Sequence, residues 1–307
     1  MEPALRQLAA YAAVARAASF TAAAHRLRVS QSTLSRAVAD LERTLGVRLL
    51  ERDTRNVQLT AAGVETLRVA EQIVAAHESG MKELRRYLLG ESGVVAVATL
   101  PSVAAVLLPR MISAFRGRRP DVSVRIMDGL ERAVLGRVLS GDADFAITTV
   151  RASSEQFEHR PLIRDQFHAV LPEGHRLAER EEVTWVELAA EPFLAVGRES
   201  SVRRLTDAAF DQAGAGVTLA AEASNVATVG GLVAAGLGVS AMPALVLPLL
   251  IPGQVVHRRL ADPVVDRRLD VVVRARRTLP LAAAAFLDLL EGFRTEELPP
   301  GVSWVDA

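Results

Sequence analysis

The sequence predicts an α/β fold for the C-terminal part of the chain, arranged as two lobes. It predicts an all-α winged helix-turn-helix domain and a long linker helix before that part. Three observations support this: a basic helical segment, a helix with a heptad pattern, and strands that alternate with helices. The 307 residues suggest about two domains at roughly 150 residues each. With 50% hydrophobic and 4% aromatic residues, the chain is typical of a soluble globular protein.

The start of the chain predicts two helices in close succession. Residues 4–18 are rich in alanine, and a second helix that Ser19 or Thr21 can cap ends near Leu27. A third helix follows after only residues 28–29. The second and third helices therefore predict a tight helix-turn-helix.

The third helix is amphipathic, with Ser30 as its expected N-cap and Gly46 as its expected C-cap. One face is apolar, formed by Leu34, Val38, Leu41 and Leu45. The polar face carries the residue types that a recognition helix needs: Gln31, Ser32, Ser35, Arg36 and Arg43. The expected DNA contacts on this helix are Gln31, Ser32, Thr33, Ser35 and Arg36. Two short strands at 49–51 and 57–59 predict a wing, on which Arg52 and Arg55 would reach phosphates or a narrow minor groove. The alternative is a solvated polar face without a partner.

A long helix is expected from Thr60, as its cap, to about Leu89. At ~1.5 Å per residue it would be roughly 45 Å long. Apolar residues recur every seven positions along it: Leu67, Val74, Met81 and Leu88. This seam predicts dimerisation through the helix. The alternative is a helix that lies on the core of its own chain.

The rest of the chain alternates between strands and helices, which predicts parallel sheets covered by helices. Strands are expected at 94–98, 122–127, 145–148, 167–171, 193–196, 217–221, 238–241 and 269–274. Helices are expected at 102–115, 130–139, 202–213, from 226 and at 281–293. No charge falls between Glu222 and His257, but several glycines and prolines interrupt that stretch, so buried core is favoured over a membrane span.

Charge and composition limit the classes of function that the chain can have. Residues 1–60 hold nine arginines against five acids, a net of +4, although the whole chain balances 36 bases with 36 acids. This basic N-terminal segment suggests a polyanion as its binding partner. The chain has no cysteine, which excludes disulfides and thiol chemistry and fits a reducing cytosol, and Lys82 is its only lysine. Charged residues interrupt the N-terminal stretch, so no secretion signal is expected.

Enzyme patterns are weak. The string at 236–241 matches G-x-G-x-x-A, but a helix is expected before it, and Pro243 follows closely. The six histidines show no metal-ligand spacing, and the nucleophile pattern G-x-S-x-G does not occur. We therefore expect no catalytic residues, no metal and no cofactor.

Residues 19–63 resemble the winged helix-turn-helix of the LysR-type transcriptional regulators over every element. Further strings in the family's order are VLLPRMISAFRGRRPDVSVRI, GDADFAI, EPFLAV, VAAGLGVSAMP and AAAAFLDLL. The family commonly has proline or alanine where Ser32 and Thr33 stand, so this chain departs from it there. Within the predicted reading face, Gln can pair with adenine and Arg with guanine in the major groove.

The resemblance implies a cytoplasmic regulator that binds double-stranded DNA and forms a homodimer or tetramer. Its C-terminal part would resemble a periplasmic-binding-protein module with a small-molecule effector between two lobes. The implied domains are a DNA-binding domain at 1–59, a linker helix at 60–90, lobe I at 91–161 and 268–295, and lobe II at 162–267.

The effector site implied by the family lies where loops after strands meet helix N-termini. In the first lobe this points to Thr99, Pro101 and Ser102, and in the second lobe to Ser200, Ser201 and Arg203. Hydroxyls and free backbone N–H groups suit a carboxylate. Asp128 ends the second strand and would repel an anion unless it pairs with an amine or hydroxyl of the ligand. The alternative is that these serines only cap helices.

We therefore predict a ligand-responsive DNA-binding transcriptional regulator. A small-molecule binding protein of transport type is the first alternative, and the basic helix-turn-helix and missing signal argue against it. An α/β enzyme with a regulatory head is the second alternative, and the absent catalytic pattern argues against that.

Overall fold

The computed structural model describes residues 2–52, 57–150 and 155–305. The chain divides into two compact units, Met1–Tyr87 (unit 1) and Leu88–Ala307 (unit 2). Among the described helices, none combines the length and the apolar character that crossing a bilayer requires.

Unit 1 begins with the predicted helices: α1 (Leu5–Ala17), α2 (Phe20–Leu27) and α3 (Gln31–Leu45). Ser19, and not Thr21, caps α2, because its side chain accepts a hydrogen bond from the backbone N–H of Ala22. Ser30 caps α3 in the same way and accepts from the N–H of Thr33 at 3.1 Å. The buried core joins all three helices through Leu8, Tyr11, Val14, Ala23, Leu34, Val38 and Leu41.

The wing is an antiparallel pair of β1 (Leu50–Arg52) and β2 (Val57–Leu59), as predicted. Its tip, with Arg55, lies outside the described residues, as does the side chain of Arg52. The wing leads into α4 (Ala61–Leu88), a helix of 28 residues. Thr60 caps it as expected, because its hydroxyl oxygen accepts a 2.9 Å hydrogen bond from the N–H of Gly63.

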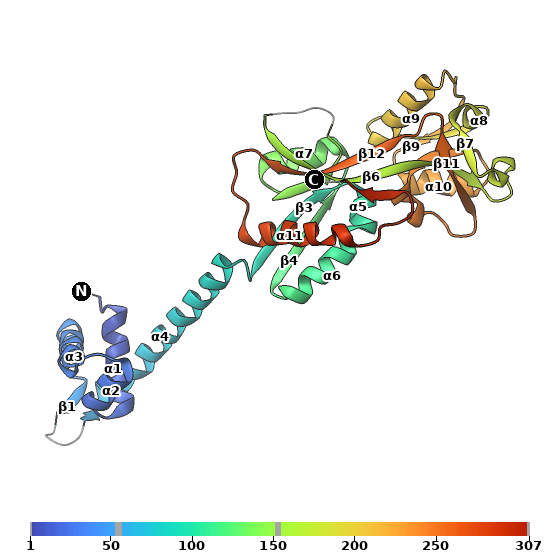
Figure 1. The fold of residues 1–307 in the computed structure, drawn as a ribbon. Helices are drawn as coiled ribbons and strands as arrows, with labels where there is room; N and C mark the ends of the chain where they lie inside the picture. The colour runs from blue at the N-terminus through green and yellow to red at the C-terminus, as the bar shows by residue number, and fades with distance from the viewer. Residues whose placement is uncertain (1, 53–56, 151–154, 306–307) are drawn as a thin grey trace. The chain divides into compact units, whose positions relative to one another are not determined.

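Unit 2 is built on a nine-stranded sheet with the order β4-β3-β5-β12-β6-β11-β7, in which β10 and β13 also pair with β6 (Figure 1). Its strands are β3 (Gly93–Thr99), β4 (Val122–Asp128), β5 (Phe145–Thr148), β6 (Phe157–Pro172), β7 (Glu182–Thr184), β10 (Ser240–Pro243), β11 (Val255–Ala261), β12 (Asp266–Arg274) and β13 (Val302–Trp304). A separate parallel pair is formed by β8 (Phe193–Val196) and β9 (Leu219–Ala223).

The α/β prediction is confirmed, but the sheet is mixed and not parallel throughout. Strands β3, β4 and β5 are parallel to one another. Strand β12 is antiparallel to both β5 and β6, and β11 is antiparallel to β6. Strand order and direction depend on long-range pairing, which the alternation of strands and helices does not encode.

The helices of unit 2 are α5 (Pro101–Val106), α6 (Leu108–Arg118), α7 (Glu131–Ser140), α8 (Trp185–Ala189), α9 (Ser201–Gln212), α10 (Val226–Ala234) and α11 (Leu281–Gly292). Short 3-10 turns occur at η1 (Arg176–Glu179), η2 (Ala244–Leu249) and η3 (Phe293–Thr295). The sequence predicted one helix over 102–115, whereas the chain breaks it at Leu107. Pro109 near the start of α6 explains the break, because proline has no N–H for the preceding turn.

Two large hydrophobic cores divide unit 2 into two lobes. In the first lobe, α6 and α11 cover β3, β5 and β12, and the ring of Phe286 lies 5.0 Å from that of Phe115. In the second lobe, the ring of Phe210 lies 5.1 Å from that of Trp185 and 5.0 Å from that of Phe193. Figure 1 shows β6 and β12 running between both groups of helices.

The chain passes between the two cores along β6 and β12. On β6, Leu162 and Ile163 belong to the first core and Phe167 belongs to the second. On β12, Leu269 belongs to the first core, and Val265, just before the strand, packs against the second. The predicted lobe boundaries stay predictions.

Candidate functional site

The first turns of α3 present polar side chains to solvent. Gln31, Ser32, Thr33 and Arg36 are exposed, and Ser35 is half-buried. The opposite face is buried in the core of unit 1 through Leu34, Val38 and Leu41. Because the apolar face anchors the helix, these polar residues are held on a rigid element that a groove of DNA can receive.

The five residues differ in how far their polar groups are occupied. The hydroxyl oxygen of Ser30 lies 2.8 Å from that of Ser32 and 2.7 Å from that of Thr33, so both hydroxyls take part in the cap of α3. In the described part of the chain, the side chains of Gln31 and Arg36 form no hydrogen bond or ion pair. Gln31 and Arg36 therefore keep all their donors and acceptors for a partner.

The predicted heptad seam of α4 is divided by the fold. Leu67 and Val74 are half-buried and pack against the core of unit 1, whereas Met81 and Leu88 are exposed. A groove of about 490 Å³ also runs beside α4. It is lined by Glu2, Pro3, Leu5, Leu8, Leu45, Glu65, Thr66, Val69 and Ile73. Unit 1 thus carries unpartnered apolar surface on a long helix.

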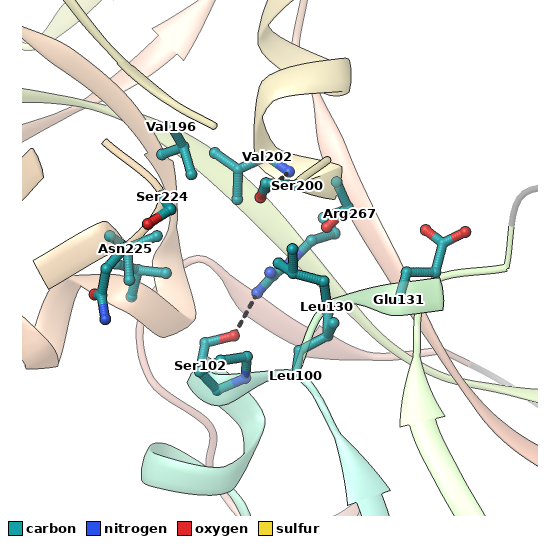
Figure 2. Close-up of a pocket in the computed structure, with 14 residues that line it drawn as sticks. Leu100, Ser102, Leu130, Glu131, Val196, Ser200, Val202, Ser224, Asn225 and Arg267 are labelled. Carbon is teal, nitrogen blue, oxygen red and sulfur yellow. Dashed lines mark hydrogen bonds between the residues drawn. The ribbon is translucent and has the colours of Figure 1, made fainter. Parts of the chain in front are cut away.

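Unit 2 contains a cavity of about 100 Å³ to which both lobes contribute (Figure 2). Its lining residues are Leu100, Pro101, Ser102, Leu130, Glu131, Val196, Ser200, Ser201, Val202, Ser224, Asn225, Val226, Val246 and Arg267. Four of the predicted effector residues are among them, namely Pro101, Ser102, Ser200 and Ser201. The side chain of Ser200 caps α9 by accepting from the N–H of Val202 at 3.1 Å.

Three predicted effector residues do not line the cavity. Thr99 is fully buried, and its hydroxyl donates a 2.8 Å hydrogen bond to the carbonyl oxygen of Ile147. Asp128 is exposed at the end of β4. These positions follow from side-chain direction at strand ends, which the sequence pattern does not give.

Arg203 is the third predicted effector residue that does not line the cavity, and its guanidinium is paired with two carboxylates of the protein. Its Nε donates to Asp207 at 2.8 Å, and its Nη1 donates to Glu222 at 2.7 Å. Burial works against the charge, but these two carboxylates hold the pKa of Arg203 above its ordinary value. Arg203 therefore belongs to the packing of α9.

Sequence reasoning missed four polar lining residues: Glu131, Ser224, Asn225 and Arg267. One feature of the sequence could have identified Arg267. It lies two residues before Leu269 and four before Val271, so on a strand its side chain points to the same buried face as theirs. A charged residue on such an apolar face is unusual. That signal becomes informative only once the strand is extended back to Asp266.

Glu131 and Arg204 approach each other from opposite lobes. Glu131 begins α7 and accepts a 2.5 Å hydrogen bond from the hydroxyl of Thr149. The Nη2 of Arg204, on α9, lies 4.0 Å from the same carboxylate oxygen of Glu131, Oε2. The carboxylate of Glu131 is thus engaged by the protein at the edge of the cavity.

Two family models match the chain over most of its length. Residues 5–64, from α1 to the start of α4, match the bacterial regulatory helix-turn-helix protein of the lysR family. Residues 89–294, which hold the cavity, match the LysR substrate binding domain. The chain belongs to the LysR family. LysR proteins are transcription regulators, and this LysR chain is a DNA-binding regulator with an effector-binding module.

Individual relatives agree with this assignment. The LysR chain is 33% identical over 290 residues to YfeR of Shigella flexneri, an uncharacterized HTH-type transcriptional regulator, with 94% of each chain covered. It is 31% identical over 259 residues to the Hca operon transcriptional activator HcaR of Escherichia coli, covering 84% of this chain and 87% of HcaR. The crystal structure of CbnR, a LysR family transcriptional regulator, superposes with a TM-score of 0.78 at 25% identity, covering 94% of this chain and 100% of CbnR.

Proposed function

We propose that this LysR regulator reads duplex DNA with the exposed first turns of α3 and responds to a small molecule in the cavity of unit 2. It acts as a homo-oligomer in the cytoplasm and without catalysis. The observation that carries the proposal is the exposed pair Gln31 and Arg36 on a helix whose opposite face is anchored in the core. These two side chains supply the bidentate groups that recognise adenine and guanine edges.

Pairing through α4 supports the reading of two half-sites. Met81 and Leu88 offer apolar surface beyond the core of unit 1, and the groove beside Val69 and Ile73 adds to it. Two copies of unit 1 that are linked through α4 bind two half-sites together, which raises affinity over that of one copy alone.

Some relatives are named as probable hydrogen peroxide-inducible genes activators, for example one from Streptomyces viridosporus at 30% identity over 296 residues. This chain contains no cysteine, so thiol oxidation is not available to it. The cavity, lined by side chains of both lobes, therefore favours a reversibly bound effector.

Selection of duplexes from a random library by the full chain tests this function. We expect enrichment of an interrupted palindrome, and we expect affinity for it to fall steeply with salt because phosphate contacts release counterions. Titration of the enriched duplex and of a shuffled duplex of equal composition gives the specificity ratio. Equal affinity for the two duplexes would overturn the proposed function.

A further inference from the structure

Two side chains on neighbouring strands form a buried ion pair beside the cavity. Arg267 on β12 is 3% exposed, Asp165 on β6 is 0% exposed, and the two are opposite each other in the antiparallel ladder. The Nε of Arg267 donates to Oδ2 of Asp165 at 3.1 Å, and its Nη2 donates to the same oxygen. Burying both charges costs desolvation free energy that their attraction does not reliably return. A contribution to stability is therefore a weak explanation for this pair.

The hydrogen bonds of the pair leave part of the guanidinium unused. Both carboxylate oxygens of Asp165 are engaged, because its Oδ1 also accepts from the backbone N–H of Leu245 at 3.0 Å. The Nη2 of Arg267 donates to the hydroxyl oxygen of Ser102 at 3.0 Å (Figure 2). Within the described part of the chain, Nη1 of Arg267 has no partner, and a guanidinium carries five N–H donors.

The other polar groups of the cavity wall add to this surplus of donors. Ser102 accepts from Arg267, so its own hydroxyl proton is free, and in the described residues Ser201 and Ser224 form no side-chain hydrogen bond. The carboxylate of Glu131 is engaged by Thr149. The remaining wall is largely apolar: Leu100, Leu130, Val196, Val202 and Val246. A ligand that matches this wall brings acceptors at one end and a short apolar body at the other.

We infer that Arg267 recognises a small monocarboxylate in this cavity, with Ser102 as a second donor. Asp165 is a positioning residue that holds the guanidinium in place. The inference rests on the proposed function, in which the cavity is the effector site. An apolar cavity of about 150 Å³ holds benzene, so one of about 100 Å³ fits a short aliphatic acid better than an aromatic one.

The position of the pair connects ligand binding to the arrangement of the lobes. Asp165 lies between Ile163 of the first core and Phe167 of the second, and Arg267 lies between Val265 and Leu269 in the same way. A carboxylate that binds to Arg267 therefore contacts β12 directly and β6 through Asp165, and these are the two strands that join the lobes. It shifts the equilibrium only as far as it prefers one arrangement over the other.

Calorimetry with the full chain at constant ionic strength tests the inference, with acetate, propionate, butyrate and benzoate as probes and propionamide as the neutral counterpart of propionate. We expect propionate to bind about tenfold or more tightly than propionamide and more tightly than benzoate. The double variant Arg267→Gln with Asp165→Asn leaves no unpaired buried charge and should lose this preference. Arg164→Gln removes a charge from a side chain on β6 that is 61% exposed, and should bind propionate as the wild type does.

Ser102→Ala keeps the ion pair and should weaken propionate binding severalfold, which gives a readout even if the double variant does not fold. Equal affinity for propionate and propionamide, wild-type affinity in the Ser102→Ala and double variants, or no binding of any acid overturns the inference. The selected duplex separates this result from the proposed function. If the acids bind as expected but no duplex is selected, only the proposed function fails; if another ligand alters DNA binding and the acids do not bind, only the inference fails.

Discussion

The hydroxyl of Tyr11 donates a 2.6 Å hydrogen bond to the carbonyl oxygen of Gly63, which ties α1 to the first turn of α4. Tyr11 is fully buried. A Cβ atom on Gly63 would lie 2.1 Å from the carbonyl oxygen of Leu49 and 3.0 Å from the hydroxyl oxygen of Tyr11. The long helix α4 is therefore fixed to α1 within unit 1, at a position where only glycine fits.

Gly63→Ala should destabilise unit 1 by about 1–3 kcal/mol, because the added methyl group overpacks the contact with the Leu49 carbonyl. Gly80→Ala is the matched control on the same helix, since its Cβ would meet nothing within 4 Å. There we expect a gain of up to about 1 kcal/mol from helix propensity. Urea unfolding followed by circular dichroism measures both, and similar effects at the two glycines would contradict the packing argument.

The stability of unit 1 should fall at alkaline pH through Tyr11. Burial, together with the negative charge of Glu42, raises the pKa of Tyr11 from 10.0 to about 12. The unfolded chain thus loses this proton first, and the stability that the neutral phenol contributes is lost as pH rises from the lower value to the higher. In Tyr11→Phe, this alkaline component of the unfolding free energy should be absent. An unchanged pH profile in that variant would exclude Tyr11 as its source.

Base reading should depend on Gln31 and Arg36. Replacing either by Ala should cost ~1–3 kcal/mol on the selected duplex and relax the base preference. Arg43→Ala removes an equal charge from an exposed residue of α3 that pairs with Asp40 at 2.9 Å, and should weaken all sequences by a similar, smaller amount. Fluorescence anisotropy over a salt series measures this. Equal loss of specificity in Arg43→Ala and Arg36→Ala would count against base contacts by Arg36.

Oligomerisation should depend on the exposed half of the α4 seam. Met81→Asp with Leu88→Asp should yield monomers, because the two charges would enter an apolar contact in which they have no partners. The fold of unit 1 should stay normal. Ser79→Asp, at another exposed position of α4, should leave the oligomer intact. Leu67→Asp should instead destabilise unit 1, since Leu67 packs against its core. Sedimentation showing an unchanged oligomer in the double variant would remove Met81 and Leu88 from the interface.

The sequence correctly predicted those helices and strands that depend mainly on residues near them in the chain. The period of Leu34, Val38 and Leu41 and the caps at Ser30 and Gly46 placed α3 correctly, since the helix depends on its own residues and one buried face. In contrast, only residues 167–171 of β6 were expected, although the strand covers Phe157–Pro172. Its first half contains Pro161 and several charges, and it forms a strand because β12 pairs along it.

The cavity shows a second limit of sequence reasoning. The strand-to-helix turn at Pro101 and Ser102 placed part of the wall correctly, because backbone order fixes where such turns lie. Thr99 was expected beside them, yet its hydroxyl turns to the carbonyl of Ile147, a neighbour that is remote in sequence. Arg267 was missed for the same physical reason, because its partners Asp165 and Ser102 come together only in the fold.

The path of the chain through β6 and β12 also sets an order for assembly during synthesis. The second lobe is completed from one continuous stretch, but the first lobe takes its central strand β12 and the helix α11 from near the end of the chain. A ribosome-bound chain that stops before Leu269 lacks the partner that β5 and β6 share. Contacts between distant segments form slowly, because their loops must close first. The core of the first lobe therefore stays incomplete, with apolar surface of β3 and β5 uncovered, until β12 and α11 have been synthesised.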